Sequence, residues 1–189
     1  MTTEKLLFSS GEIRSGVQQL CEAVLRDFKA DPEYVLLGLH KQGVPLAERI
    51  AAHLQEHCGI RPAVGKLDIS MYRDDIGLRS GLPLIRETEI PFNMENAKVI
   101  LVDDVLSSGR AIRAALDAVT SFGRPACIRL AVLIDRGRPD FPIRADYVGF
   151  CAFDVDPSQK IVLKMTENDG EDAAVAIQWR STGAETGGK

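Results

Sequence analysis

Two adjacent carboxylates, Asp103 and Asp104, stand directly after the apolar run Val99–Val102 and shortly before the loop Ser107–Gly109. Carboxylates can accept hydrogen bonds from sugar hydroxyls or reach a divalent cation. The first backbone N–H groups of the helix predicted after the loop have no partner inside that helix and lie at its positive end, where phosphate binds well. The pattern therefore predicts a site for a diol and a phosphate together, as in a sugar phosphate.

The same loop also has a purely structural interpretation. A strand-to-helix turn with a serine N-cap would account for Ser108 and Gly109. It would not account for Asp103 and Asp104, because adjacent carboxylates behind a buried strand repel each other. We therefore favour the ligand-binding interpretation.

The hydrophobic pattern predicts the elements that position these residues. Helices are predicted over 10–29, 44–57 and 110–122, where apolar residues recur every three or four positions. Buried strands are predicted over 34–39, 64–72, 98–102 and 127–134, with shorter strands over 147–150, 160–165 and 173–179. This alternation indicates an α/β fold: a parallel sheet with helices on both faces, which binds ligands at the carboxyl ends of its strands.

Two segments depart from this pattern. Residues 74–97 contain several glycines and prolines and show little periodicity, which is typical of a flap over a functional site. The segment 181–189 has the composition of a disordered tail. We expect residues 1–180 to form one domain that carries this flap and a small strand-rich hood.

The composition is that of an ordinary globular protein, with 26% charged and 45% hydrophobic residues among 189. The formal net charge of −4 argues against a surface that binds nucleic acid as a whole. The first residues, Met-Thr-Thr-Glu, do not resemble an export signal, and the apolar runs are too short to cross a membrane. The cysteines are scattered, with no CxxC pair. We therefore expect a cytoplasmic protein with reduced thiols and no membrane partner.

Residues 99–111 resemble the motif that binds phosphoribosyl diphosphate (PRPP) in type I phosphoribosyltransferases. Three further stretches, 38–50, 67–75 and 131–149, are similar to one subfamily, the bifunctional pyrimidine operon regulators and uracil phosphoribosyltransferases. The similarity covers most of residues 10–179. It implies the type I phosphoribosyltransferase fold and the transfer of phosphoribose to uracil, which gives UMP and pyrophosphate.

The resemblance also implies roles for individual residues. Asp103 and Asp104 would be the catalytic carboxylates and hold the ribose hydroxyls, while Arg73 on the flap would approach the pyrophosphate. Mg²⁺ would be carried by PRPP, without direct protein ligands. The loop after the first predicted strand, 34–39, would bind pyrophosphate through Lys41, Gln42 and Gly43. The loop after the carboxylates would bind the 5-phosphate through Val105, Leu106, Ser107, Ser108, Gly109, Arg110 and Ala111. The uracil base would be framed by Asp135, Arg136, Gly137 and Gly149.

Some positions depart from the family pattern. Gln42 stands where the family usually has arginine, Ala111 replaces the usual threonine, and Phe150 replaces a residue that is usually basic. Because arginine binds phosphate oxygens in pairs, we expect Gln42→Arg to raise catalytic efficiency, unless Lys41 already fills that role.

Two alternatives to a fully active enzyme therefore stay open. One is a UMP-responsive RNA-binding attenuator that recognises an mRNA leader, and the other is a nucleotide sensor with weak or no activity. The resemblance implies that the first-helix face and residues 138–150 would contact RNA, and both are depleted in cations here. A homo-oligomer, a dimer or larger, is also expected.

Overall fold

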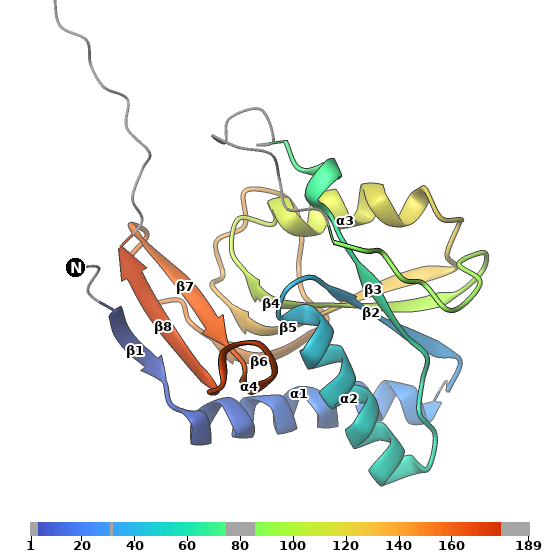
Figure 1. Cartoon of the computed structure of the whole chain (residues 1–189), viewed down its shortest axis with the longest axis horizontal. Coiled ribbons are helices and arrows are strands. Elements are labelled where there is room, and N and C mark those ends of the chain that lie inside the picture. The colour runs from blue at the N-terminus through green and yellow to red at the C-terminus, as the bar shows by residue number, and fades with distance from the viewer. Residues whose placement is uncertain (1–3, 31, 75–85, 179–189) are drawn as a thin grey trace, which may run out of the picture.

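The computed structural model describes residues 4–30, 32–74 and 86–178. Its centre is a parallel sheet of five strands in the order β3-β2-β4-β5-β6 (Figure 1). The strands are β2 (Tyr34–Leu39), β3 (Val64–Leu67), β4 (Lys98–Leu106), β5 (Cys127–Asp135) and β6 (Tyr147–Cys151). Helices α1 (Ser10–Ala30) and α2 (Gly43–Cys58) cover one face, and α3 (Arg110–Thr120) covers the other. The predicted fold class is confirmed.

Alternating side chains of the strands supply the two halves of the core. In β4, Ile100 and Val102 pack with α1 and α2, whereas Val99 and Leu101 pack with α3. All four side chains are fully buried. Strands that are apolar on both faces need helices on both sides of the sheet, which is why the continuous apolar runs of the sequence indicated this architecture.

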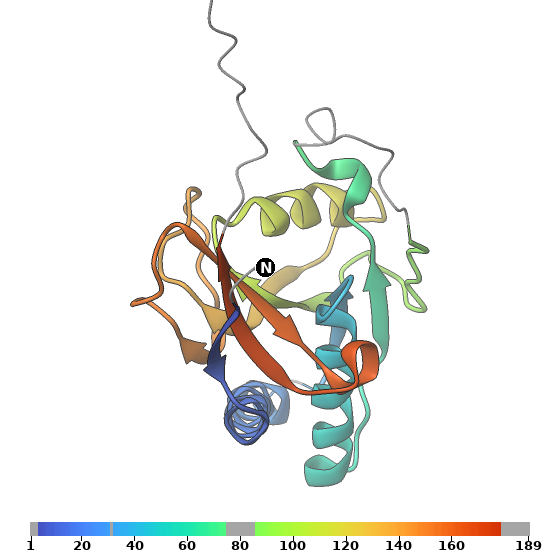
Figure 2. The same cartoon turned by 60° about the vertical axis from the view of Figure 1, so that its left-hand side comes forward.

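A second, antiparallel sheet of three strands forms the hood, in the order β1-β8-β7. It consists of β1 (Glu4–Phe8), β7 (Gln159–Lys164) and β8 (Ala173–Gln178), with the short helix α4 (Thr166–Asp169) between the last two. Figures 1 and 2 show the hood beside the parallel sheet, at the end where the parallel strands finish. The sequence did not predict β1 or α4, because β1 is a strand only through its pairing with β8 and α4 is a single turn.

The segment after β3 differs from its prediction. The strand expected over 64–72 ends at Leu67, and Ser70–Tyr72 forms a 3-10 turn. Asp68 ends the strand, because its carboxylate accepts the backbone N–H of Ser70 at 2.7 Å. Glu89, which lies in the returning part of the predicted flap 74–97, forms an antiparallel bridge with Lys66.

Parts of two predictions lie outside the described residues: the middle of the flap, 75–85, and the tail 181–189. The single domain over 1–180 stays a prediction. Among the described helices, none is long and apolar enough to span a membrane.

Candidate active site

Asp103 and Asp104 lie in β4, the middle strand of the parallel sheet, close to its carboxyl end. Asp103 is 8% exposed, and its Oδ1 accepts the backbone N–H of Asp104 at 2.9 Å. The Oδ1 of Asp104 in turn accepts the backbone N–H of Val105 at 2.8 Å. Each of the two consecutive carboxylates is thereby tied to the backbone N–H of the next residue, near the edge of the sheet where ligands bind in α/β folds.

Burial, followed by the charge of Asp104, raises the pKa of Asp103 well above its ordinary value. Burial likewise raises the pKa of Asp104. The positive charges of Arg73 and Lys160 oppose these shifts at Asp103 and Asp104 respectively. A carboxylate pair whose ionisation is disfavoured in the ligand-free chain is typical of a binding site, because a cation or hydroxyl donors brought by a ligand offset the repulsion.

The loop after β4 has the backbone of an anion site. Gly109 has a φ of 83°, in the left-handed region that favours glycine, and α3 starts at the next residue. The Ser108 Oγ accepts the backbone N–H of Arg110 at 3.4 Å, and the Ser108 carbonyl accepts the N–H of Asp140 at 2.8 Å. Ser107 is exposed. The predicted 5-phosphate loop is thus a tight turn that leads into a helix N-terminus.

The other residues predicted for this loop supply its flanks. Val105 and Leu106 end β4, and Arg110 and Ala111 open α3. The side chain of Arg110 is engaged on the surface, 2.6 Å from Asp74 and 3.6 Å from Asp140. Because the guanidinium of Arg110 is paired in this structure, residue 110 would contribute to an anion site through its backbone in the first turn of α3.

The loop after β2 lies directly beside the carboxylates. A Cβ built on Gly43 would stand 2.4 Å from the Val102 carbonyl oxygen and 3.3 Å from the Asp103 Cα. Lys41, two residues earlier, is exposed. Because β2 and β4 are neighbours in the sheet, the fold brings the predicted pyrophosphate loop and the predicted ribose site together.

The side chain of Gln42 is placed differently from the prediction. It is only 7% exposed, and its Nε2 donates to Asp169 Oδ2 at 2.6 Å and to the Leu163 carbonyl at 3.1 Å. Its Oε1 accepts from Asn168 Nδ2 at 2.7 Å. The hood and α4 therefore engage the amide of Gln42 in this structure. The predicted contact of position 42 with pyrophosphate stays a prediction, and the backbone at this position is the part that is free of these side-chain bonds.

The turn Ser70–Tyr72, which precedes the predicted flap, is attached to α3. Arg113 Nη2 donates to the Tyr72 carbonyl at 3.3 Å, and the Tyr72 hydroxyl donates to Ser121 Oγ at 3.1 Å. Arg73 follows directly, and its charge acts on Asp103. The position of Arg73 is consistent with its predicted approach to the ligand from the flap.

Asp68 joins the two chain segments at the base of the predicted flap. Its carboxylate accepts the backbone N–H groups of Ser70, which precedes the predicted flap, and of Arg86, which lies in the flap's returning part. The ring of His40 hydrogen-bonds to the Glu87 carbonyl at 3.1 Å, which ties the returning chain to the loop after β2. The base of the flap and the pyrophosphate loop are thus directly connected.

The loop after β5 was predicted to frame the base. The Asp135 Oδ1 accepts the backbone N–H of Gly137 at 2.7 Å, which makes a tight turn. Arg136 donates to the Asp156 carbonyl at 3.1 Å and lies 3.5 Å from Ser107 Oγ. Its guanidinium thereby links the predicted 5-phosphate loop to the chain between β6 and β7.

Gly149 and Phe150 have packing roles. A Cβ on Gly149 would meet the carbonyl oxygens of Leu133 and Gly16 at 2.8 and 2.9 Å, so a glycine is needed between β5 and α1. This placement does not support the expected contact of Gly149 with a base. The ring of Phe150 stacks on Phe8, with centroids 4.6 Å apart, which explains an aromatic residue where the family usually has a basic one.

The structure adds residues that sequence reasoning missed, above all Lys160, Asn168 and Asp169. Lys160 is on β7 of the hood, and its charge acts on Asp104. Asn168 and Asp169 bind Gln42. No local spacing signal marks them, because they lie more than 50 residues along the chain from the groups that they approach.

Comparisons with known proteins agree with this geometry. A family model described as "Phosphoribosyl transferase domain" matches residues 7–164. "Bifunctional protein PyrR" of Chloroflexus aurantiacus is 44% identical over 178 residues, which cover 94% of this chain and 97% of the relative. The protein of the same name from Thermus thermophilus is 42% identical over 178 residues, with the same coverage.

Solved structures show the same fold at low sequence identity. Hypoxanthine phosphoribosyltransferase of Trypanosoma cruzi aligns with a TM-score of 0.68 at 18% identity, over 93% of this chain and 97% of that one. A hypoxanthine-guanine phosphoribosyltransferase from Bacillus anthracis aligns with a TM-score of 0.65 at 22% identity, over 93% and 98% of the two chains. These similarities concern the fold alone.

Proposed function

Since this chain belongs to the phosphoribosyltransferase family, and within it to the bifunctional PyrR proteins, we propose that it makes UMP and pyrophosphate from uracil and PRPP. One observation carries the proposal: Asp103, the turn at Gly109 and the loop at Gly43 converge at the carboxyl ends of two neighbouring strands. Ribose hydroxyls, a 5-phosphate and a pyrophosphate are the three groups of PRPP, and each has a chemically suitable partner there.

In this transfer the bond between ribose C1 and pyrophosphate breaks, and a bond from C1 to a uracil nitrogen forms while that nitrogen loses its proton to water or to the departing pyrophosphate. Positive charge develops on the ribose. The carboxylates of Asp103 and Asp104 hold the ribose hydroxyls and orient the sugar. Lys41 and the backbone of Gln42 and Gly43 stabilise the charge on the departing pyrophosphate. No side chain acts as a covalent nucleophile in this scheme.

Magnesium fits this site as a companion of PRPP. The raised pKa values of Asp103 and Asp104 show that a nearby positive charge would be favourable. Within 4–30, 32–74 and 86–178, however, no three His, Cys, Asp or Glu side chains lie together as a metal site. Mg²⁺ would therefore bind mainly to PRPP oxygens and water, with the carboxylates nearby, and would neutralise the pyrophosphate.

A steady-state assay tests the proposal. Uracil, hypoxanthine and orotate are each supplied with PRPP and Mg²⁺, and the released pyrophosphate is measured. We expect UMP formation from uracil to be the fastest reaction and to stop when EDTA removes the metal. An equal or faster rate with hypoxanthine would contradict the choice of uracil, and no transfer to any base would contradict the enzymatic function.

Regulation of pyrimidine genes through an mRNA leader is the second activity of this family. In this chain, carboxylates of the segment 138–150, which is expected to face RNA, pair with arginines from outside that segment: Asp146 with Arg129 at 3.2 Å and Asp140 with Arg110 at 3.6 Å. Such pairing leaves fewer cations for phosphates. We therefore propose that RNA binding by this chain is weaker than PRPP binding and depends little on salt concentration, which filter binding with a pyrimidine-operon leader RNA at several salt concentrations would test.

A further inference from the structure

The loop between β2 and α2, which carries Lys41, is hydrogen-bonded to α4, a helix more than 120 residues later in the sequence. Asn168 Nδ2 donates to Gln42 Oε1 at 2.7 Å and lies 3.4 Å from the Lys41 carbonyl oxygen. Asp169 Oδ2 accepts from Gln42 Nε2 at 2.6 Å and also from the backbone N–H of Met165 at 2.9 Å. The single turn α4 therefore contacts both the backbone and a side chain of this loop.

These contacts use the whole amide group of Gln42. Its Nε2 has two protons, which go to Asp169 and to the Leu163 carbonyl, and its Oε1 accepts from Asn168. A side chain with every polar atom engaged and 7% exposure has one defined orientation. Because Gln42 immediately precedes α2, this orientation also sets the backbone between β2 and α2.

We propose that Asn168 and Asp169 are positioning residues for phosphoribosyl transfer: through Gln42 they hold the loop His40–Gly43 in the shape that receives the pyrophosphate of PRPP. The inference rests on the proposed function. Neither residue touches the reacting atoms in this scheme. Their contribution is a loop that is already ordered when PRPP arrives, so that less conformational entropy is lost on binding.

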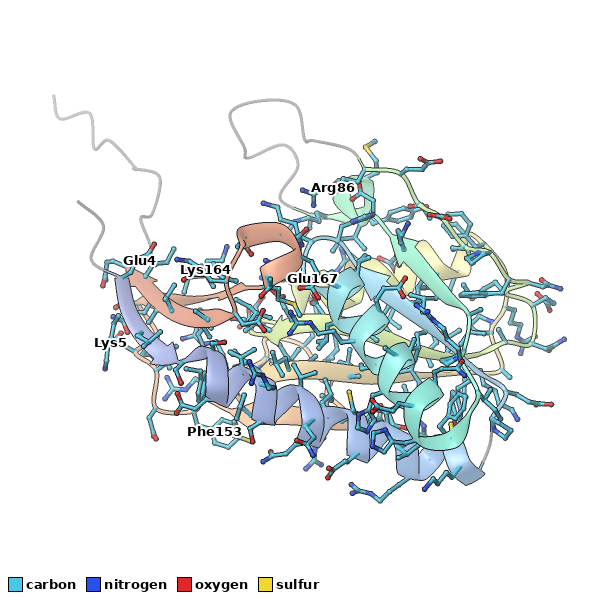
Figure 3. The ribbon with its side chains drawn as sticks, turned by 60° about the horizontal axis from the view of Figure 1, so that its bottom comes forward. Glu4, Lys5, Arg86, Phe153, Lys164 and Glu167 are labelled. Carbon is cyan, nitrogen blue, oxygen red and sulfur yellow. The ribbon has the colours of Figure 1, made fainter. Side chains whose placement is uncertain are left out.

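A separate set of contacts attaches α4 to α2, so this role can be tested without unfolding the hood. Arg49 donates to Glu167 at 2.7 Å and to Asp172 at 2.8 Å, and Figure 3 shows Glu167 between α4 and α2. The Asp172 carboxylate also accepts the backbone N–H of Thr166 at 2.8 Å. These bonds do not involve the loop and remain when Asn168 is changed. Asn168 itself is exposed, so its replacement leaves no cavity.

The experiment compares two ligands that differ in their use of this loop. PRPP carries the pyrophosphate, whereas UMP carries only the 5-phosphate, which belongs at the turn of Gly109. Calorimetry with Mg²⁺ measures both affinities in the wild type, Asn168→Ala and Asn168→Asp. The second variant has the same shape but cannot donate to Gln42 Oε1. The matched control is Glu167→Gln, on the same turn of α4 but directed to Arg49.

We expect both Asn168 variants to bind PRPP about three- to tenfold more weakly, equal to about 0.7–1.4 kcal/mol, because they lose the bond to Gln42 Oε1 and the longer contact with the Lys41 carbonyl. UMP affinity and melting temperature should stay near the wild-type values, and Glu167→Gln should bind both ligands normally. Unchanged PRPP affinity in the Asn168 variants, or an equal loss of PRPP and UMP affinity, would overturn the positioning role alone. A wild type that does not bind PRPP would overturn the proposed function as well.

Discussion

Gly43 packs so tightly against Val102 that a Cβ on the glycine would stand 2.4 Å from the Val102 carbonyl oxygen. Cβ atoms do not approach backbone oxygens this closely, so a larger residue must displace the start of α2 from β4. Asp103 follows Val102 directly. The packing of this one glycine thus fixes the distance between the predicted pyrophosphate loop and the carboxylates.

Gly43→Ala should therefore damage binding and stability together. We expect a loss of about 1–3 kcal/mol in the free energy of unfolding, the usual result of overpacking, and a large loss of PRPP affinity. Denaturant unfolding and calorimetry measure the two effects. Gly11→Ala is the matched control, because nothing lies within 4 Å of a Cβ built on Gly11. A Gly43→Ala protein that binds PRPP normally would contradict the close approach.

Asp103→Asn should stabilise the ligand-free chain at neutral pH while it abolishes PRPP binding. The pKa of Asp103 is higher in the folded chain than its ordinary value of 3.8, so ionisation of this carboxyl costs stability as the pH rises through the folded pKa. Asparagine does not ionise, and its Oδ1 can still accept the N–H of Asp104. Thermal melts should show an advantage for the variant that is largest at neutral pH and disappears as the pH falls towards 3.8. A variant that is less stable at neutral pH, or that retains PRPP affinity, would refute this account of the pair.

Arg49→Met should destabilise the attachment of α4 to α2. Hydrogen bonds from Arg49 lower the pKa of Asp172 from 3.8 to about 2, so the contribution of this pair is present above pH 3.8 and is lost as the pH falls towards about 2. At neutral pH we expect a loss of about 2 kcal/mol in the free energy of unfolding, as is usual for charged hydrogen bonds. The difference in the free energy of unfolding between Arg49→Met and the wild type should shrink as the pH falls below 3.8.

Arg61→Met is the control for that experiment. Arg61 also lies 2.7 Å from a carboxylate, Glu48, but the two side chains are 56% and 42% exposed. We expect its loss to cost less than about 1 kcal/mol, as for exposed ion pairs. If Arg49→Met and Arg61→Met lost the same free energy of unfolding, burial would not strengthen the ion pairs of Arg49 with Glu167 and Asp172.

Gln42→Arg should not raise turnover, contrary to the expectation from the sequence. Asp169 and the Leu163 carbonyl lie where the guanidinium would enter, so the new charge would pair with Asp169 rather than with pyrophosphate. The exposed Lys41 is the better source of positive charge, and Lys41→Met should weaken PRPP binding. Turnover and the PRPP Michaelis constant of both variants decide between these accounts. A faster Gln42→Arg enzyme would restore the sequence-based hypothesis.

The parts of this protein that could be predicted from sequence are those with a local physical signature. The apolar run of β4, the adjacent carboxylates and the turn at Gly109 are contiguous, so strand burial, helix start and anion site could be inferred within 13 residues, 99–111. The helices likewise follow from the period of their apolar residues, and the parallel strands follow from their continuous apolar runs. These features indicated the fold class and the position of the ligand at the carboxyl edge.

Only the tertiary structure decided where the side chains of the predicted site lie and which partners they contact. The sequence placed Gln42 among the predicted pyrophosphate residues, but its amide hydrogen-bonds to Asn168 of α4, 126 residues later. Gly149 had the position of a base-site residue, but it fills the contact between β5 and α1. A side chain turns towards whichever partner satisfies its polar atoms or fills its space, and here those partners come from distant segments that no local pattern connects.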